Sequence, residues 1–333
     1  MRDGSQDRRK RAFLVTPGTW TALAGLAGAA LGLGLIAHYG IATVHGLIRR
    51  SGFGLVAIVA LHCLQLGLTA FGWKSLLSRH PGLSSAFLFL VRWVREGVST
   101  VLPLTPVGGV VVGVRLLCRR GIRMAAASAA TVVDLSLELA SQIVFAMLGL
   151  MGLMHLVAPS AASIPILAGL FGLTAMAAAF AASQWLGLAR VAERMAGRLG
   201  MTGRVEGLHD AIIDAYRAPG ALMICALLHL MAWLAGTFEV WLAMHFLGGN
   251  IGLGESFVIE SLGQMLKTAS FAIPAALGIQ EGGYVLICGI FGVGPDLALA
   301  LSLMKRLREI ALGVPGIVVW LCFERRPRLD VAT

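Results

Sequence analysis

Near its C-terminal end the chain combines strongly apolar sequence with an unusual number of charges. Residues 259–320 are hydrophobic enough for helices in a bilayer, yet the apolar runs on either side of a short linker hold seven charged side chains: Glu260, Lys267, Glu281, Lys305, Arg306, Arg308 and Glu309. Each such group costs about 2.5 to 3.5 kcal/mol near the centre of a bilayer, so it is kept where it faces protein or water. We interpret this stretch as half of a polar site inside a membrane protein.

The helices expected in this stretch are also interrupted. Pro274 and Gly278 fall in the middle of an apolar segment, and the run TPVGGVVVG, residues 105–113, breaks an earlier segment in the same way. Broken helices at membrane depth are tolerated where the backbone is buried in protein or lines a wet cavity. The sequence therefore predicts the bends of two helical hairpins at these residues: Pro103, Pro106, Gly108, Gly109, Pro274, Gly278, Gly282 and Gly283.

Composition places the chain among polytopic membrane proteins. Charged residues make up 13% of the sequence and hydrophobic residues 57%, whereas a soluble domain carries about 25% charged residues. The longest polar interval, 186–219, is too short to form a domain with its own core. Residues 1–333 are therefore expected to form a single integral membrane domain. Within it, 186–219 is interpreted as an amphipathic cytoplasmic connector, with a plain solvated connector as the alternative.

Basic and metal-binding residues restrict the partners. The net charge of +10 comes from Lys and Arg in short loops and at the two ends of the chain, as the positive-inside rule predicts for cytoplasmic segments. No nucleic-acid partner is therefore expected. The five cysteines stand singly and the histidines lack ligand spacing, so no disulfide framework, metal site or cofactor is predicted. The histidines on or beside apolar segments are expected to be packed or interfacial: His62, His155, His229 and His245.

Six segments are long enough to cross a bilayer, which takes about 20 helical residues. They cover residues 18–38, 53–73, 123–156, 163–184, 220–246 and 297–322. If the interrupted segments 84–118 and 253–292 enter and return on the same side, most basic loops remain cytoplasmic. The expected fold is an all-α polytopic protein with six spanning helices and two re-entrant hairpins. Its first span is retained, and both termini lie on the cytoplasmic side of a bacterial inner membrane.

The two interrupted segments divide the chain into similar halves, 53–156 and 220–322, each of which reads as span, hairpin and span. The first hairpin would enter from the cytoplasm and the second from outside, which makes the halves an inverted repeat. Such repeats place transporter binding sites near the midplane. At an offset of 171 residues the following positions coincide: Pro103 with Pro274, Glu138 with Glu309, Asp134 with Lys305, and Glu96 with Lys267.

Helical spacing groups the charges into faces. Side chains three or four positions apart lie together on a helix, and four such groups occur: Arg92, Arg95 and Glu96; Asp134, Glu138 and Gln142; Glu260, Gln264 and Lys267; Lys305, Arg308 and Glu309. We expect the acidic face of the first half to meet the basic face of the second near a two-fold axis. Structural ion pairs that bind nothing are the alternative interpretation.

An apparent excess of basic residues suggests the ligand. Arginine offers a planar set of donors that suits phosphate, so an anionic or polyhydroxyl head group is expected at Arg92, Arg95 and the basic residues of 259–320. Gln280 and Glu281 are expected to face the cavity. Glu239, alone on its span, is interpreted either as a proton-coupling carboxylate or as a partner of an arginine. No nucleophile with an adjacent base is visible, so an enzyme is not expected.

Three runs of sequence carry a family resemblance. FAIPAALGIQEGGYVLICGIFGV (271–293) and ALALSLMKRLREIALGVPGIVVW (298–320) resemble the second-half signature of the lysylphosphatidylglycerol synthase transmembrane family, also called flippase-like. VREGVSTVLPLTPVGGVVVGVRLL (94–117) resembles the first-half counterpart, although Val110 and Val111 stand where the family usually has an acidic residue. The most similar branch is the hopanoid-associated HpnL. The matching motif positions are Pro274, Gly278, Gln280, Glu281, Gly282, Gly283, Arg306 and Glu309.

The resemblance implies a membrane domain that moves lipid between leaflets. Bifunctional relatives carry a soluble aminoacyltransferase domain after it, and this sequence ends at Thr333, so synthesis of lysyl-lipid is not expected. The expected cargo is a hopanoid first and an anionic phospholipid second. Alternatives are a lipid-modifying enzyme using Glu138, Glu281 or Glu309 as acid or base, a scaffold for lipid-synthesis enzymes, and a polyprenyl-phosphate carrier. A homodimer and complexes with lipid-synthesis enzymes stay open.

The first prediction concerns two charged motif positions. We expect Arg306→Ala or Glu309→Ala to stop lipid movement in reconstituted vesicles without unfolding the protein, because both side chains are assigned to the polar site. Normal lipid movement by both variants would remove these residues from the site.

Overall fold

The computed structural model describes residues 46, 49, 51–78, 80, 82–101, 108–156, 172, 207–269 and 279–325. Within these ranges the regular structure is helical and contains no strand. The helices are α4 (Gly54–Leu76), α5 (Ser85–Val101), α6 (Gly108–Cys118), α7 (Met124–Leu156), α10 (Leu208–Tyr216), α11 (Pro219–Phe246), α12 (Leu253–Ala269), α13 (Ile279–Ile290) and α14 (Pro295–Arg325). The predicted spans 18–38 and 163–184 lie outside the described residues.

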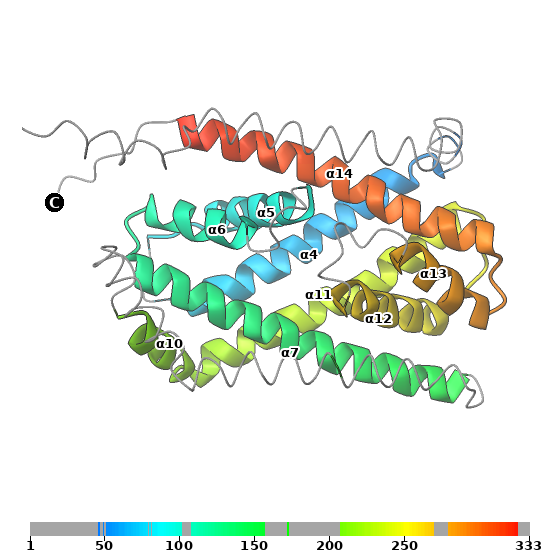
Figure 1. Cartoon of the computed structure of the whole chain (residues 1–333), viewed down its shortest axis with the longest axis horizontal. Coiled ribbons are helices and arrows are strands. Elements are labelled where there is room, and N and C mark those ends of the chain that lie inside the picture. The colour runs from blue at the N-terminus through cyan, green and yellow to red at the C-terminus, as the bar shows by residue number, and fades with distance from the viewer. Residues whose placement is uncertain are drawn as a thin grey trace, which may run out of the picture.

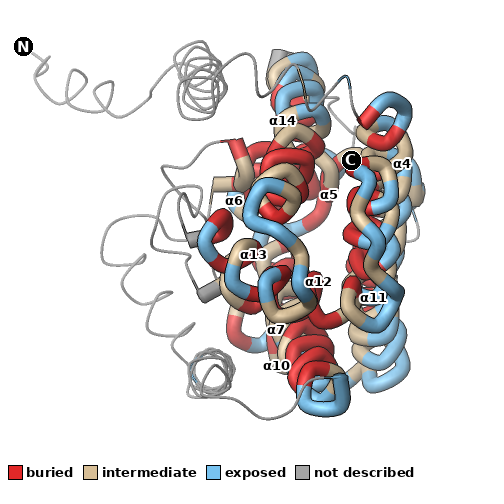
Figure 2. The backbone as a smooth tube through the Cα atoms, turned by 90° about the vertical axis from the view of Figure 1, so that its right-hand side faces the viewer, coloured by how far each residue is buried: buried red, intermediate tan, exposed pale blue. Residues whose placement is uncertain are grey.

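Within the described ranges, three helices are long and apolar enough to cross a membrane: α4, α7 and α11, with mean hydropathies of 1.9, 1.8 and 1.9. They coincide with three predicted spans. Large apolar side chains stand exposed along them, as with Phe71 on α4 and Phe238 on α11, which are 54% and 51% exposed. Figure 2 shows exposed positions recurring along both helices. An apolar outer surface of this extent is typical of a protein that faces lipid.

Helix α14 corresponds to the predicted span 297–322 and has a different character. It runs for 31 residues, with Pro315 inside it, and its first half carries Lys305, Arg306, Arg308 and Glu309. Proline removes one main-chain hydrogen bond from a helix and usually bends it. At the far end of α14, Glu324 forms ion pairs with two guanidinium groups, that of Arg115 in the last turn of α6 at 2.8 Å and that of Arg119 just after α6 at 3.3 Å.

Helices α5 and α6 pack together as an antiparallel pair. Arg120, which follows α6, lies over the ring of Phe87 near the start of α5, at 4.5 Å. At the other end, a Cβ on Gly109 would overlap the carbonyl of Arg95, so only glycine allows this approach. The connection, 102–107, lies outside the described residues together with Pro103 and Pro106.

Helices α12 and α13 form a second pair, at the opposite end of the molecule from α5 and α6 (Figure 1). Their connection, 270–278, lies outside the described residues together with Pro274 and Gly278. Gly282 and Gly283 belong to α13 rather than to a bend, which differs from the sequence expectation. Gly283 instead lets α13 approach Leu266 of α12. Gly108 and Gly109 likewise open α6 and lie in its first turn.

Each helix pair packs against the long helix of the other half. Helix α5 contacts α14 where Gly97 faces Gly313, and α12 contacts α7 where Gly149 faces Ser261. Helices α4 and α11 pack extensively on one another between these two assemblies. The two halves of the chain are therefore interlocked, and a space between them is bordered by both.

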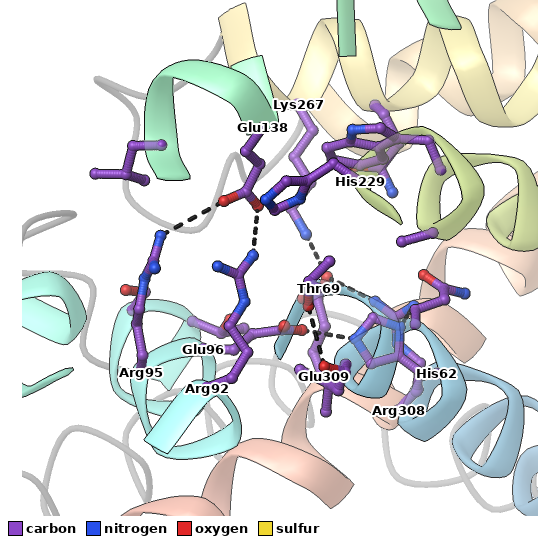
Figure 3. Close-up of a pocket in the computed structure, with 18 of the residues that line it drawn as sticks. His62, Thr69, Arg92, Arg95, Glu96, Glu138, His229, Lys267, Arg308 and Glu309 are labelled. Atoms are coloured by element: carbon purple, nitrogen blue, oxygen red, sulfur yellow. Dashed lines mark hydrogen bonds and ion pairs between the residues drawn. The ribbon is translucent and has the colours of Figure 1, made fainter. Parts of the chain in front are cut away.

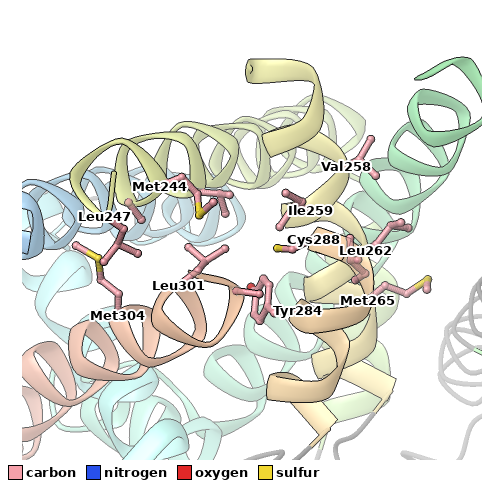
Figure 4. Close-up of a cluster of buried hydrophobic side chains, with 14 of the residues drawn as sticks. Met244, Leu247, Val258, Ile259, Leu262, Met265, Tyr284, Cys288, Leu301 and Met304 are labelled. Atoms are coloured by element: carbon pink, nitrogen blue, oxygen red, sulfur yellow. The ribbon is translucent and has the colours of Figure 1, made fainter. Parts of the chain in front are cut away.

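Two buried apolar clusters hold the helices together. One joins α11, α12, α13 and α14 around residues such as Leu262, Tyr284 and Leu301, and these side chains converge in Figure 4. The other surrounds α5 and α6 and includes the fully buried Trp73 of α4. Close-packed interiors of this kind transmit small displacements.

Helix α10 falls within the predicted connector 186–219. It packs on α7 with Ile212 buried in a small apolar cluster, while Asp210 is exposed. The amphipathic interpretation of the whole connector stays a prediction. Residues 186–206, which complete the connector, lie outside the described residues.

The contact between α5 and α14 gives a stability prediction. A Cβ on Gly97 would lie 2.9 Å from the Gly313 carbonyl oxygen, whereas nothing lies within 4 Å of a Cβ on Gly67 in α4. We expect Gly97→Ala to destabilise the protein by about 1 to 3 kcal/mol through overpacking, and Gly67→Ala to leave stability unchanged or slightly raised. Thermal unfolding in detergent measures both, and equal melting temperatures would contradict the close packing of α5 on α14.

Candidate functional site

A cavity of about 330 Å³ lies between the two halves of the chain. Helices α4, α5, α6, α7, α11, α12 and α14 contribute to its wall, and Figure 3 shows charged side chains from several of them converging on it. Among the residues that the sequence predicted for the site, these line the cavity: Arg92, Arg95, Glu96, Glu138, Lys267, Arg308 and Glu309.

The first-half charges form a cluster around Asp134. Its Oδ2 accepts hydrogen bonds from Arg92 NH1 at 2.8 Å and Arg95 NH1 at 2.7 Å, and its Oδ1 lies 2.9 Å from His229 Nε2. Glu138 accepts a further bond from Arg92 NH2 at 2.9 Å. The spacing of Arg92 and Arg95 on α5, and of Asp134 and Glu138 on α7, puts each pair on one helix face. This cluster ties α5, α7 and α11 together.

A second cluster lies away from the cavity, between α12, α13 and α14. Lys305 forms an ion pair with Glu260 and lies 5.9 Å from the ring centre of Tyr284. Arg306 Nε donates to Glu281 at 2.7 Å. Of the predicted site residues, those that the structure does not bring to the cavity wall are Asp134, Glu260, Gln280, Glu281, Lys305 and Arg306.

Arg308 and Glu309 link the last helix to the cavity. Arg308 forms an ion pair with Glu239 of α11, which also accepts a hydrogen bond from Gln65 at 3.0 Å. Glu309 forms an ion pair with Lys267 of α12. Of the two roles proposed for Glu239 from sequence, the structure therefore contains the partnership with an arginine.

The expected meeting of opposite helix faces is wrong. The acidic face of α7 pairs with the arginines of α5, in its own half, and the basic face of α14 pairs with Glu239 and Glu260. The reason is geometric: α5 lies next to α7 and brings two guanidinium groups to Asp134, whereas α14 packs mainly on α5 and α13. Each face is neutralised by neighbouring helices rather than by its counterpart.

Exposure corrects the inferred excess of positive charge. The side chains of Arg92 and Arg95 are 5% and 6% exposed, and both are engaged by carboxylates. The charged side chains that remain open to the cavity are mixed: Glu96 at 39%, Lys267 at 38% and Glu138 at 27%. A ligand therefore meets both carboxylates and an ammonium group, rather than a cluster of free guanidinium groups.

Several cavity residues were not predicted from sequence. His62 and His229 were interpreted as packed residues, yet both line the cavity and contact carboxylates. Their presence inside apolar spans was a usable signal, since ionisable groups at that depth usually serve a function. Neutral residues outside the predicted helix faces gave no such signal: Gln65, Thr69, Ser99, Thr100 and Trp233.

One group of side chains has the composition of a metal site. Ligand atoms of Asp134, Cys225 and His229 lie within 4.8 Å of one another, and all three residues are buried. However, the same Asp134 carboxylate accepts hydrogen bonds from both Arg92 and Arg95. A metal cation placed there would meet two guanidinium charges, so the donor set favours the arginines over a metal.

The structure separates the two positions named in the first prediction. Glu309 lines the cavity, whereas Arg306 is 3% exposed and pairs with Glu281 behind it. Removing one member of a buried ion pair leaves an uncompensated charge. We therefore expect Arg306→Ala to lower stability as well as activity, and Glu309→Ala to be the cleaner probe of the cavity.

Comparison with known proteins identifies one family. A family model described as the lysylphosphatidylglycerol synthase TM region matches residues 22–316, which is most of the chain. Neither the curated proteins nor the solved structures contain a match.

Asp134 gives the prediction for this site. Asp134→Ala leaves Arg92 and Arg95 buried beside one remaining carboxylate, so we expect a loss of about 3 to 5 kcal/mol of stability. Glu138→Ala removes a half-exposed carboxylate and should cost much less, because both arginines keep Asp134 as a partner. Unfolding in detergent measures the difference, and equal losses would contradict the central place of Asp134.

Proposed function

Because the chain belongs to the lysylphosphatidylglycerol synthase transmembrane family, we propose that it is a lipid transporter of the flippase type in a bacterial inner membrane. The observation that supports this most strongly is the polar cavity of about 330 Å³, bordered by helices of both halves. The cavity lies in a protein whose long helices expose apolar side chains. A polar chamber opening within an apolar exterior suits a cargo with one polar and one apolar end.

In this proposal the head group occupies the cavity while the apolar part of the lipid stays in the bilayer. Moving a polar head through hydrocarbon without partners costs several kcal/mol for each unsatisfied group. The open side chains of Glu96, Glu138 and Lys267, with Ser99 and Thr100 beside them, replace those lost bonds to water. The protein thereby lowers the barrier to crossing and needs no covalent chemistry.

The mixed lining favours a head group rich in hydroxyls over a simple anion. Carboxylates accept hydrogen bonds and an ammonium donates them, so Glu96, Glu138 and Lys267 together suit a polyhydroxylated lipid. A hopanoid is therefore the first candidate, in line with the resemblance to the HpnL branch. An anionic phospholipid, held by Lys267, is the second.

We further propose six spans and two re-entrant hairpins related by an inverted repeat, with both termini cytoplasmic. The helix contacts support the repeat, because contacts in one half have counterparts in the other. The contact of α5 with α14 corresponds to that of α12 with α7, and the contact of α4 with α5 corresponds to that of α11 with α12. Single residues agree as well. Gly97 faces Gly313, and the positions 171 residues away from them, Thr268 and Gln142, form a hydrogen bond at 2.6 Å.

Reconstitution tests the function. Fluorescent phosphatidylglycerol, and separately a polyhydroxylated hopanoid, are placed in vesicles that contain the purified chain, and the share of probe in each leaflet is followed by chemical quenching or extraction. We expect movement by the unaltered protein and a loss of about tenfold or more in Glu138→Gln and in Lys267→Gln, since a charged hydrogen bond contributes about 1.5 to 3 kcal/mol.

The matched control is Asp296→Asn, which removes an exposed carboxylate at the start of α14, outside the cavity. It should move lipid at the normal rate. Absence of movement by the unaltered protein for both probes would contradict transport. A chemically changed lipid after incubation, detected by mass spectrometry, would favour a membrane enzyme instead.

A further inference from the structure

Among the described residues, the ion pairs at the cavity and in the cluster of α12, α13 and α14 are one positive charge short. Seven carboxylates of α5, α7, α11, α12, α13 and α14 take part in them, against six lysine and arginine side chains. Six carboxylates have a lysine or arginine partner. The remaining one, Glu96, has its ion pair within the described ranges with a histidine, His62.

His62 lies between two carboxylates and an arginine. Its Nε2 is 2.6 Å from Glu96 Oε1, and its Nδ1 is 3.3 Å from Glu239 Oε2 and 2.9 Å from Arg308 NH1. One ring on α4 therefore contacts α5, α11 and α14 at the cavity wall. The side chain of Glu96 is 39% exposed and that of Glu239 is 1% exposed, so the ring lies between an open and a closed carboxylate. Figure 3 shows His62 with Glu96 and Arg308 at the cavity.

The two neighbours of Nδ1 require different protonation states. A guanidinium group only donates hydrogen bonds, so Arg308 can bond to Nδ1 only when that nitrogen carries no proton. A proton on Nδ1 would instead be donated to Glu239, and the bond from Arg308 would be lost. Adding one proton to the ring therefore replaces Arg308 by Glu239 as the partner of Nδ1, and it neutralises the negative charge left over at Glu96.

The charged groups around His62 are otherwise compensated. On α5, Arg92 is held by Asp134 and Glu138 of α7. On α14, Glu309 is held by Lys267. On α11, Glu239 is held by Arg308 and lies 3.9 Å from Lys305, and His229 contacts Asp134 instead. The negative charge that lacks a lysine or arginine partner is therefore that of Glu96, next to His62.

We propose that His62 and Glu96 form a proton-binding site that takes up one proton when a lipid head group fills the cavity and releases it when water returns. This rests on the proposed function, and it names the coupling ion. While water fills the cavity it screens Glu96, but a head group displaces that water and makes an unpaired carboxylate costly. By linkage, lower pH then strengthens lipid binding.

The proton site is tested first without any cargo. Solid-state NMR of the full chain with ¹⁵N-labelled histidine, in nanodiscs of phosphatidylcholine alone, reports how many protons each ring carries. His62→Gln assigns the signal. We expect His62 to gain a second proton between about pH 9 and pH 5, and Glu96→Gln to move this change to lower pH by about one unit or more.

Asp296→Asn, far from the ring, should leave the titration unchanged. Because Glu96→Gln keeps the ring and has the same shape as the natural residue, it remains informative if His62→Gln fails to fold. A His62 ring with constant protonation over this range, or one that is insensitive to Glu96→Gln, would overturn the site.

Coupling to cargo is tested by counting protons. A pH-indicator dye in weak buffer follows the addition of short-chain phosphatidylglycerol or of a solubilised polyhydroxylated hopanoid to the purified protein. We expect uptake of up to one proton per chain, lost in His62→Gln. Binding without uptake, or uptake that persists in His62→Gln, would overturn coupling.

Phosphatidylethanolamine separates a second source of the missing charge. If this amine-bearing lipid binds without proton uptake while the other probes do not bind, then the cargo supplies the cation and the coupling to a proton is wrong. Failure of every probe lipid to bind contradicts the proposed function, whereas the ring titration decides the proton site independently.

Discussion

The buried bond between carboxylate and guanidinium is the interaction on which this structure depends. Asp134 has no exposed surface, and the arginines beside it are almost as buried. Taking such charges out of water is costly, and apolar side chains would often hold helices together as well. Bonds of this kind therefore fix the relative position of α5, α7 and α11, because a shift that separates Asp134 from its partners would leave a buried charge unpaired. The cavity has a defined shape because its wall is built from these paired groups.

Small residues complement the charged bonds. Gly97 with Gly313 and Gly149 with Ser261 let a short helix of one half lie directly on a long helix of the other. In a bilayer, where the apolar environment gives little drive for helices to associate, such close contact is a principal source of attraction. The two halves are thus held together by van der Waals contacts where the helices cross and by ion pairs around the cavity. The polar groups can then serve a ligand without also having to carry the whole stability of the fold.

Sequence predicted the long apolar helices well, because about 20 uninterrupted hydrophobic residues leave few alternatives. The predicted segment 123–156 and α7, Met124–Leu156, differ by one residue. Spacing also placed Asp134 and Glu138 on one helix face. It could not identify their partners, since periodicity describes one helix and pairing depends on which helix lies beside it. The predicted bend at Gly282 and Gly283 was wrong, because both residues belong to α13. Glycine destabilises a helix by about 1 kcal/mol relative to alanine, and the close packing of Gly283 on Leu266 offsets this loss.

Pro315 lies within α14, and the parts of the helix before and after it contact different neighbours. The part of α14 before Pro315 brings Arg308 and Glu309 to the cavity, and the part after it is held near its end by the ion pairs of Glu324 with Arg115 and Arg119. Close to Pro315, the indole N–H of Trp93 on α5 donates a hydrogen bond to the Leu312 carbonyl at 2.8 Å, which holds α14 against α5 at this point. A bend at Pro315 would tilt the part of α14 that carries Arg308 and Glu309 while the ion pairs of Glu324 keep the other end in place. A local change among the ion pairs at the cavity would then become a movement of half a helix.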